Sequence, residues 1–127
     1  MSAWRAKAIE MFPELKKDIE DSDSAGDLWF SLFSIFKHGI KTEDYDISLL
    51  VSKYADWCIV NTSSSDVSGP HQATLMGFYE SISYDKGIWP QLSKALPKRQ
   101  FLQNIGTFKY CLSDSEIEHM KQCFNEA

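Results

Sequence analysis

The sequence lacks the usual marks of an enzyme and of a membrane protein. Its six glycines are scattered singly, so there is no glycine-rich phosphate loop, and no nucleophile motif of the form Gly-x-Ser-x-Gly occurs. Nowhere do about 18 apolar residues run together, and the N-terminal segment has no apolar core of signal-peptide length. We therefore predict a cytoplasmic protein that is not an enzyme and needs no cofactor.

Positive charge is scarce as well. Lysine and arginine number 13 against 18 aspartates and glutamates, which gives a formal net charge of -5. Nucleic acids and anionic membranes are both held by clustered positive charge, so we expect neither as a partner. The charge is uneven along the chain, because residues 1–85 hold 14 acids and 7 bases, whereas residues 86–113 hold 5 bases and no acid.

The three cysteines, Cys58, Cys111 and Cys123, form an odd set without regular spacing. This pattern indicates reduced, buried thiols and not a disulfide framework. Glu116, His119 and Cys123 have the spacing of a partial metal site on one helix face. A structural zinc site needs four ligands and a di-iron bundle needs two Glu-x-x-His pairs, of which this chain has one. We therefore expect no metal site.

Apolar residues recur at steps of three and four along most of the chain, and no run of strict alternation is long enough for a strand. With 43% apolar content in 127 residues, the chain suits one domain over residues 1–127. We predict an all-α fold of six or seven short helices arranged as antiparallel hairpins. These hairpins form either a compact bundle or a short right-handed superhelix of the HEAT or armadillo kind.

An aromatic-rich helix is predicted over residues 27–38 and a second over residues 42–60, and together they form a hairpin. Gly39 stands where the left-handed residue that ends a helix is wanted. Pro70 suits the first turn of another helix, in which Gly77 lets a neighbouring helix come close. The spacing also predicts one continuous helix over residues 100–112.

Two capping boxes mark helix starts. Ser24 is followed by Asp27, and Ser113 is followed by Glu116, each three residues on. In such a box the hydroxyl accepts a bond from an amide of the first turn, and the acid lies against the positive end of the helix. A helix is therefore predicted to begin after each serine.

The densest run of one charge sign lies before and within the start of the aromatic-rich helix. Its acids can pair with a basic protein surface, because complementary fields speed encounter and help to select a partner. Glu80 joins them as a polar residue on the flank of an apolar helix face. The candidate partner-binding residues are Asp18, Glu20, Asp21, Asp23, Asp27 and Glu80.

Several packing landmarks, in their order, resemble a small bacterial family of all-helical domains of unknown function, some of whose relatives occur among immunity-type proteins. The resembling segments are Phe12-Pro13-Glu14-Leu15, Gly26-Asp27-Leu28, Tyr79-Glu80, Trp89 with Leu92, the helix around Phe101, and Tyr110-Cys-Leu-Ser with Phe124. The chain departs from the pattern at residues 63–69, which are more polar. The resemblance implies an all-helical fold and carries over no functional residue.

These observations favour a non-enzymatic protein-interaction module, whose specific form is an immunity-type inhibitor of a basic toxin. The competing hypothesis is a small-molecule binder or enzyme with a pocket between helices, where Tyr54, Trp57, His71 and Tyr79 converge. A monomer and a homodimer are both compatible with the sequence.

Overall fold

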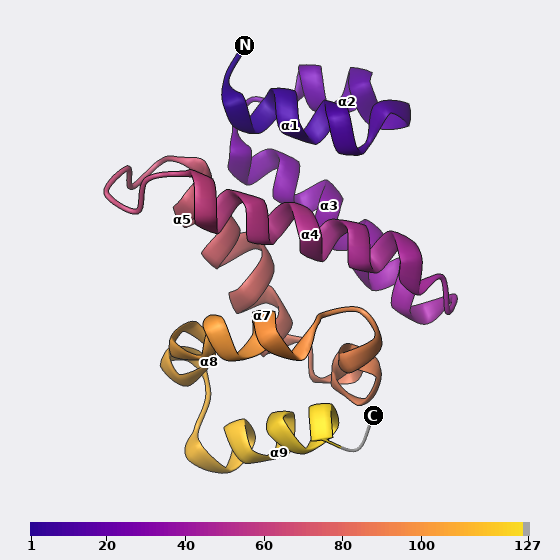
Figure 1. The fold of residues 1–127 in the computed structure, drawn as a ribbon, viewed down its shortest axis with the longest axis vertical. Coiled ribbons are helices and arrows are strands. Elements are labelled where there is room, and N and C mark those ends of the chain that lie inside the picture. Colours follow the sequence, from indigo (N-terminus) through magenta and orange to yellow (C-terminus); the bar gives the residue numbers. More distant parts are fainter. Residues whose placement is uncertain (126–127) are drawn as a thin grey trace.

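Two long antiparallel helices cross the middle of the molecule. The computed structural model describes residues 1–125, and in it α3 (Ala25–Lys41) and α4 (Tyr45–Asn61) form the hairpin that the sequence predicts (Figure 1). Helix α3 buries Leu28, Leu32 and Phe36 at steps of four, which places them on one face. The turn between the helices contains Glu43, whose positive φ of 60° reverses the chain direction.

Gly39 does not end α3, so that prediction is wrong. It lies inside the helix, because the start of α4 packs against it. A Cβ at this position would meet the Ser48 hydroxyl and would lie 2.8 Å from the Asp44 carbonyl oxygen. The Ser48 hydroxyl donates to the Phe36 carbonyl at 2.8 Å. A glycine is therefore required here by the close approach of two helices and not by a left-handed backbone.

The chain begins with a small helical layer made of α1 (Ala3–Met11), a 3-10 turn η1 (Pro13–Leu15) and α2 (Lys16–Asp21). Phe12 and Ile19 anchor this layer and are fully buried. Arg5 donates to the carbonyls of Ile19 and Glu20 at the end of α2. The last carbonyls of a helix lack internal partners, so this guanidinium stabilises the end of α2.

A bent rod follows the serine-rich loop and packs under α3. It consists of α5 (Pro70–Thr74), a π-helical segment η2 (Leu75–Glu80) and α6 (Ser81–Tyr84). The Trp29 indole N–H donates to the Thr74 hydroxyl at 3.0 Å, and a Cβ on Gly77 would lie 2.5 Å from the Trp29 Cβ. The predicted close approach at Gly77 is confirmed.

The last third of the chain is divided more finely than the periodicity predicts. It comprises the 3-10 segment η3 (Lys86–Lys94), α7 (Lys98–Gln103), α8 (Ile105–Cys111) and α9 (Asp114–Asn125). The single helix expected over residues 100–112 is therefore wrong. It breaks at Asn104, which leaves helical geometry with a ψ of 17° while its side-chain amide donates to the Gln100 carbonyl. Asparagine offers the backbone this local alternative to a helix.

The all-α prediction is confirmed. Residues 1–125 contain nine α-helices, two 3-10 segments and one π segment, and no strand. The α1–α2 layer lies at one end of the long axis of the molecule, the α3–α4 hairpin comes next, and α9 lies at the other end (Figure 1). Within this described part, no helix combines the length and the apolar character needed to cross a membrane.

Gly77 and Gly106 allow a matched test of the contact between α3 and η2. Gly77→Ala forces the two segments apart, and overpacking of this kind costs about 1–3 kcal/mol, which exceeds the gain in helix propensity. Gly106 lies in α8 with nothing within 4 Å of an added Cβ. Gly106→Ala is therefore expected to raise the free energy of unfolding by up to about 1 kcal/mol. Urea unfolding of both variants measures the difference, and equal effects would show that the Gly77 contact is not tight.

Candidate functional site

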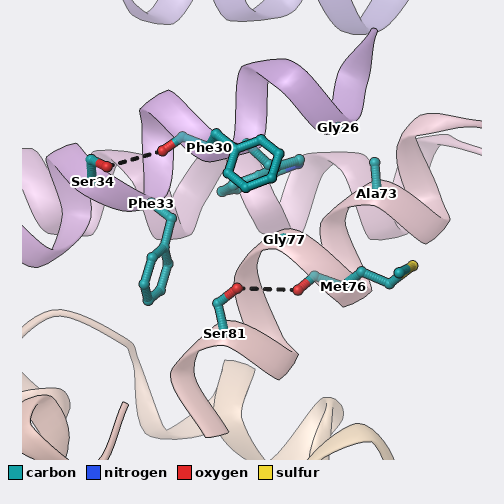
Figure 2. A pocket seen from close by; sticks show the side chains of 9 residues that line it. Gly26, Phe30, Phe33, Ser34, Ala73, Met76, Gly77 and Ser81 are labelled. Carbon is teal, nitrogen blue, oxygen red and sulfur yellow. Dashed lines mark hydrogen bonds between the residues drawn. The ribbon is translucent and has the colours of Figure 1, made fainter. Parts of the chain in front are cut away.

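An open apolar groove lies between α3 and the rod formed by α5, η2 and α6. Its volume is about 490 Å³. The residues that line it are Gly26, Trp29, Phe30, Phe33, Ser34, Ala73, Met76, Gly77 and Ser81. Figure 2 shows the two walls, with Phe30, Phe33 and Ser34 on α3 and with Ala73, Met76 and Ser81 on the rod.

Large apolar side chains are exposed to solvent in the groove. Phe30 is 80% exposed and Met76 is 63% exposed, although Trp29 beside Phe30 is buried. An added Cβ on Gly26 would have only the Ser24 hydroxyl oxygen within 4 Å, at 3.5 Å, so this lining position has free space beside it. Contiguous apolar surface of this kind is typical of a protein-interaction or ligand-binding site.

The polar groups of the groove are few and are engaged with the backbone. The Ser34 hydroxyl donates to the Phe30 carbonyl at 3.1 Å, and the Ser81 hydroxyl donates to the Met76 carbonyl at 3.2 Å (Figure 2). Both hydroxyl protons are therefore used in hydrogen bonds to backbone carbonyls of the same segment. The groove presents an apolar surface to an occupant.

The π-helical geometry of η2 shapes one wall. The bond from Ser81 to Met76 spans five residues, which matches the wider turn of a π-helix. This turn buries Phe78 and Tyr79 on the core side while Met76 stays exposed at the groove. Single π turns inside α-helices are frequent at functional sites.

Two of the predicted partner-binding acids stand at the start of the α3 wall. The Asp27 amide donates to the Ser24 hydroxyl at 3.2 Å, which confirms this capping contact, and the Asp27 carboxylate accepts from the Asp23 amide at 3.2 Å. Asp27 is adjacent to Gly26 and one helical turn before Phe30. Because residues three and four apart share a helix face, Asp27 borders the groove.

The other predicted acids lie further away along the chain. Asp18, Glu20 and Asp21 are exposed on α2 and do not line the groove. Within residues 1–125, no ion pair engages any of the five carboxylates of the acidic run. Glu80 is half-buried at the end of η2, next to Ser81 of the opposite wall.

One turn beyond the far end of the groove, the charges are already paired. Lys37 Nζ lies 2.7 Å from an Asp85 carboxylate oxygen and joins α3 to the residue that follows α6. Within the part of the chain that the structure describes, Asp23, Asp27 and Glu80 have no ion-pair partner. Among such unpaired charged residues, they are the closest in the chain to the residues that line the groove. We call these three carboxylates, which flank the lining residues in the chain, the acidic rim of the groove.

The four residues predicted to converge on an interhelical pocket do not line either described hollow together. Tyr54 and Tyr79 are buried in the core, where the Tyr54 hydroxyl donates to the Trp4 carbonyl at 2.9 Å and the Tyr79 oxygen accepts from the Gln100 amide at 2.8 Å. Burial raises the pKa of both phenols well above the ordinary value, so both stay neutral. They fill the interior and line neither of the two hollows described here.

The Trp57 ring stacks on the Tyr54 ring with a centroid distance of 6.3 Å, but Trp57 and His71 form no common pocket lining with the two phenols. Trp57 lines a second, mixed hollow of about 390 Å³ between α1 and α4, which also contains Lys7, Glu10, Lys53 and Asp56. His71 is on α5, and its buried Nδ1 has no hydrogen-bond partner. The expected pocket is thus replaced by the groove, whose lining contains none of these four residues.

Glu116 and His119, two of the three residues with the spacing of a metal site, have separate contacts. Glu116 accepts from the Ser113 amide at 2.9 Å and pairs with Lys86 at 2.5 Å, which confirms the second capping box. The His119 ring packs edge-on against Trp89 with a centroid distance of 5.8 Å. Among residues 1–125 no cluster of three or more histidine, cysteine or carboxylate side chains is arranged to hold a metal ion.

The cysteines differ in burial. Cys58 is fully buried, and burial raises the pKa of its thiol, which makes it a poor nucleophile. Cys111 and Cys123 are half-buried, so the prediction of three buried thiols is correct for Cys58 alone.

Comparison with protein-family models, with curated proteins and with solved structures finds no match for this chain. The resemblance suggested by the packing landmarks therefore stays an expectation. The candidate site is defined by its own geometry as an apolar groove with an acidic rim on an all-α domain.

Sequence reasoning identified the acids of the rim and missed the groove. Gly26 and Ala73 give no signal by themselves, and Phe30 belongs to a segment that is apolar on almost every side. The available signal was Gly77, whose missing side chain predicted a close helix contact. The acidic neighbours of the groove were found because charge runs are visible in one dimension.

The Glu116 carboxylate allows a pH test of the second capping box. The hydrogen bond and ion pair with Lys86, together with the Ser113 bonds, lower its pKa from 4.5 to about 2. A lowered folded-state pKa stabilises the protein above pH 4.5, and this contribution is lost as the pH falls towards 2. NMR titration of the Glu116 side chain measures the pKa, and Glu116→Gln is expected to flatten the acid limb of the stability profile. An ordinary pKa at Glu116 would contradict the pairing.

Proposed function

We propose that this chain is a non-enzymatic interaction protein that binds a basic surface of another protein with the region where α2 leads into α3. The observation that carries the proposal is the exposed acidic run, free of ion pairs in the described structure, beside a groove with an 80% exposed phenylalanine. A charged rim steers encounter, and an apolar centre supplies most of the binding energy.

The resemblance implies a particular form of this function, an immunity-type inhibitor of a basic toxin. Inhibition by simple occlusion suits such a role, since an acidic surface competes directly with an anionic substrate for a basic active site. The proposal takes the chain as a cytoplasmic monomer or homodimer whose partner is a protein, and neither a nucleic acid nor a membrane.

A small-molecule site is the competing function, and the groove has a suitable volume for one. Such sites normally bring a few polar groups together to orient the ligand. In this groove the two hydroxyl protons are bound to backbone carbonyls, and the aromatic and histidine residues expected to converge lie elsewhere. The geometry therefore favours a protein partner.

Charge reversal at Asp21 and Asp23 tests the proposed function. Asp21→Lys combined with Asp23→Lys is expected to weaken capture of the partner about tenfold or more at low salt, because two attractive charges become repulsive. The melting temperature should stay nearly unchanged, since both side chains are exposed and a lysine at the end of α2 complements the helix dipole. Affinity purification from the native cell, followed by binding measurements at several salt concentrations, provides the readout.

The matched control is Glu43→Lys with Asp46→Lys, which makes the same change in net charge at the turn between α3 and α4. This control should retain capture. Equal binding by the Asp21 and Asp23 variant, or equal loss in the control, would reject the acidic run as the recognition surface.

A further inference from the structure

We propose that the groove between α3 and the α5–η2–α6 rod receives one amphipathic helix of the partner, whose apolar face fills the groove and whose flanks carry lysine or arginine. This inference rests on the proposed function and specifies the chemistry of the partner. It assigns the groove as the place of apolar contact and the rim as the place of charge contact.

The apolar part of the fit follows from the lining. Phe30 and Met76 stand on opposite walls, both largely exposed, and the buried Trp29 also lines the groove. Grooves of this kind bind helices through apolar anchors spaced at three and four residues. Methionine suits such a wall because its flexible side chain adapts to the shape of an anchor.

The charged part of the fit follows from the rim. Asp23 and Asp27 stand at the start of one wall and Glu80 near the end of the other, while Lys37 beyond the far end is neutralised by Asp85. An occupant with acidic flanks would meet three like charges, whereas one with basic flanks would gain complementary pairs. A helix with acidic flanks and a second copy of this chain are the occupants that the experiment must separate from a basic helix.

Gly26 offers a position from which the groove can be blocked. Gly26 has room for a side chain, since the nearest atom to an added Cβ is the Ser24 hydroxyl oxygen at 3.5 Å. A larger side chain at this position would improve helix propensity and extend into the groove. The position therefore allows the groove to be blocked without damage to the fold.

The test uses synthetic amphipathic peptides with leucine or phenylalanine at anchor spacing and with lysine at both flanks. Amide spectra of the isotope-labelled protein follow binding through the six glycine signals. Saturable shifts are expected at Gly26 and Gly77 and not at Gly39 or Gly106, which lie outside the lining. A peptide with the same anchors and glutamate flanks should bind about tenfold more weakly or worse at low salt.

Two leucine variants provide the matched control. Gly26→Leu should weaken the lysine-flanked peptide about tenfold or more by filling the groove, while its melting temperature is retained or raised. Gly106→Leu makes the same chemical change on α8, where nothing lies within 4 Å, and should leave peptide binding unchanged. Reduced binding by both variants would place the contact outside the groove and overturn the proposal.

The remaining outcomes are also decisive. The proposal fails if no peptide of the set moves Gly26 and Gly77 up to about 1 mM, the weak limit of useful recognition. Equal binding of both flank types rejects the basic occupant, and shifts that depend on protein concentration without peptide identify a second copy. Partner capture distinguishes the two proposals. If the Asp21 and Asp23 variant loses capture but Gly26→Leu does not, the proposed function is retained and the groove is rejected as the binding site.

Discussion

Trp29 is the side chain on which the packing of this molecule depends. Its indole donates to Thr74, its ring packs against Tyr54 at 5.7 Å and Phe78 at 5.2 Å, and its Cβ lies against Gly77. One residue of α3 thereby contacts α4, α5 and η2. Close-packed interiors tolerate little change in volume, so the distance between α3 and the rod is set by what fits around this ring. Because the same residue lines the groove, the core and the candidate binding surface share one constraint.

Burial distinguishes the two functional hypotheses, the protein-interaction module and the small-molecule binder or enzyme. The phenols of Tyr54 and Tyr79 and the thiol of Cys58 are buried and held in their neutral forms, so they serve packing. Phe30 and Met76 are instead exposed at the groove, and the exposed acidic run lies where α2 leads into α3. Recognition by a surface needs groups that water can reach before the partner arrives, and this region provides them.

Local patterns predicted the local structure well. Both capping boxes form, the α3–α4 hairpin appears, and Gly77 meets its neighbour as expected. The errors occur where particular local or tertiary contacts override periodicity. Gly39 stays helical because α4 packs on it, the rod contains a π turn, and the apolar stripe over residues 100–112 is interrupted at Asn104. Apolar periodicity predicts which residues face the core. It does not predict where a competing hydrogen bond to the backbone interrupts the helix.

The sequence by itself determined the all-α class, the capped helix starts and the acidic character of residues 18–27, because helix spacing, caps and charge are properties of neighbouring residues. Only the tertiary structure decided that Trp29 is buried while Phe30 beside it is exposed, and that residues 26–34 and 73–81 enclose a groove. Both segments are largely apolar, and their amino-acid sequences do not predict the angle at which the two helices cross. That angle follows from packing around Trp29 and Gly77, where a bond between residues 45 positions apart joins the two helices.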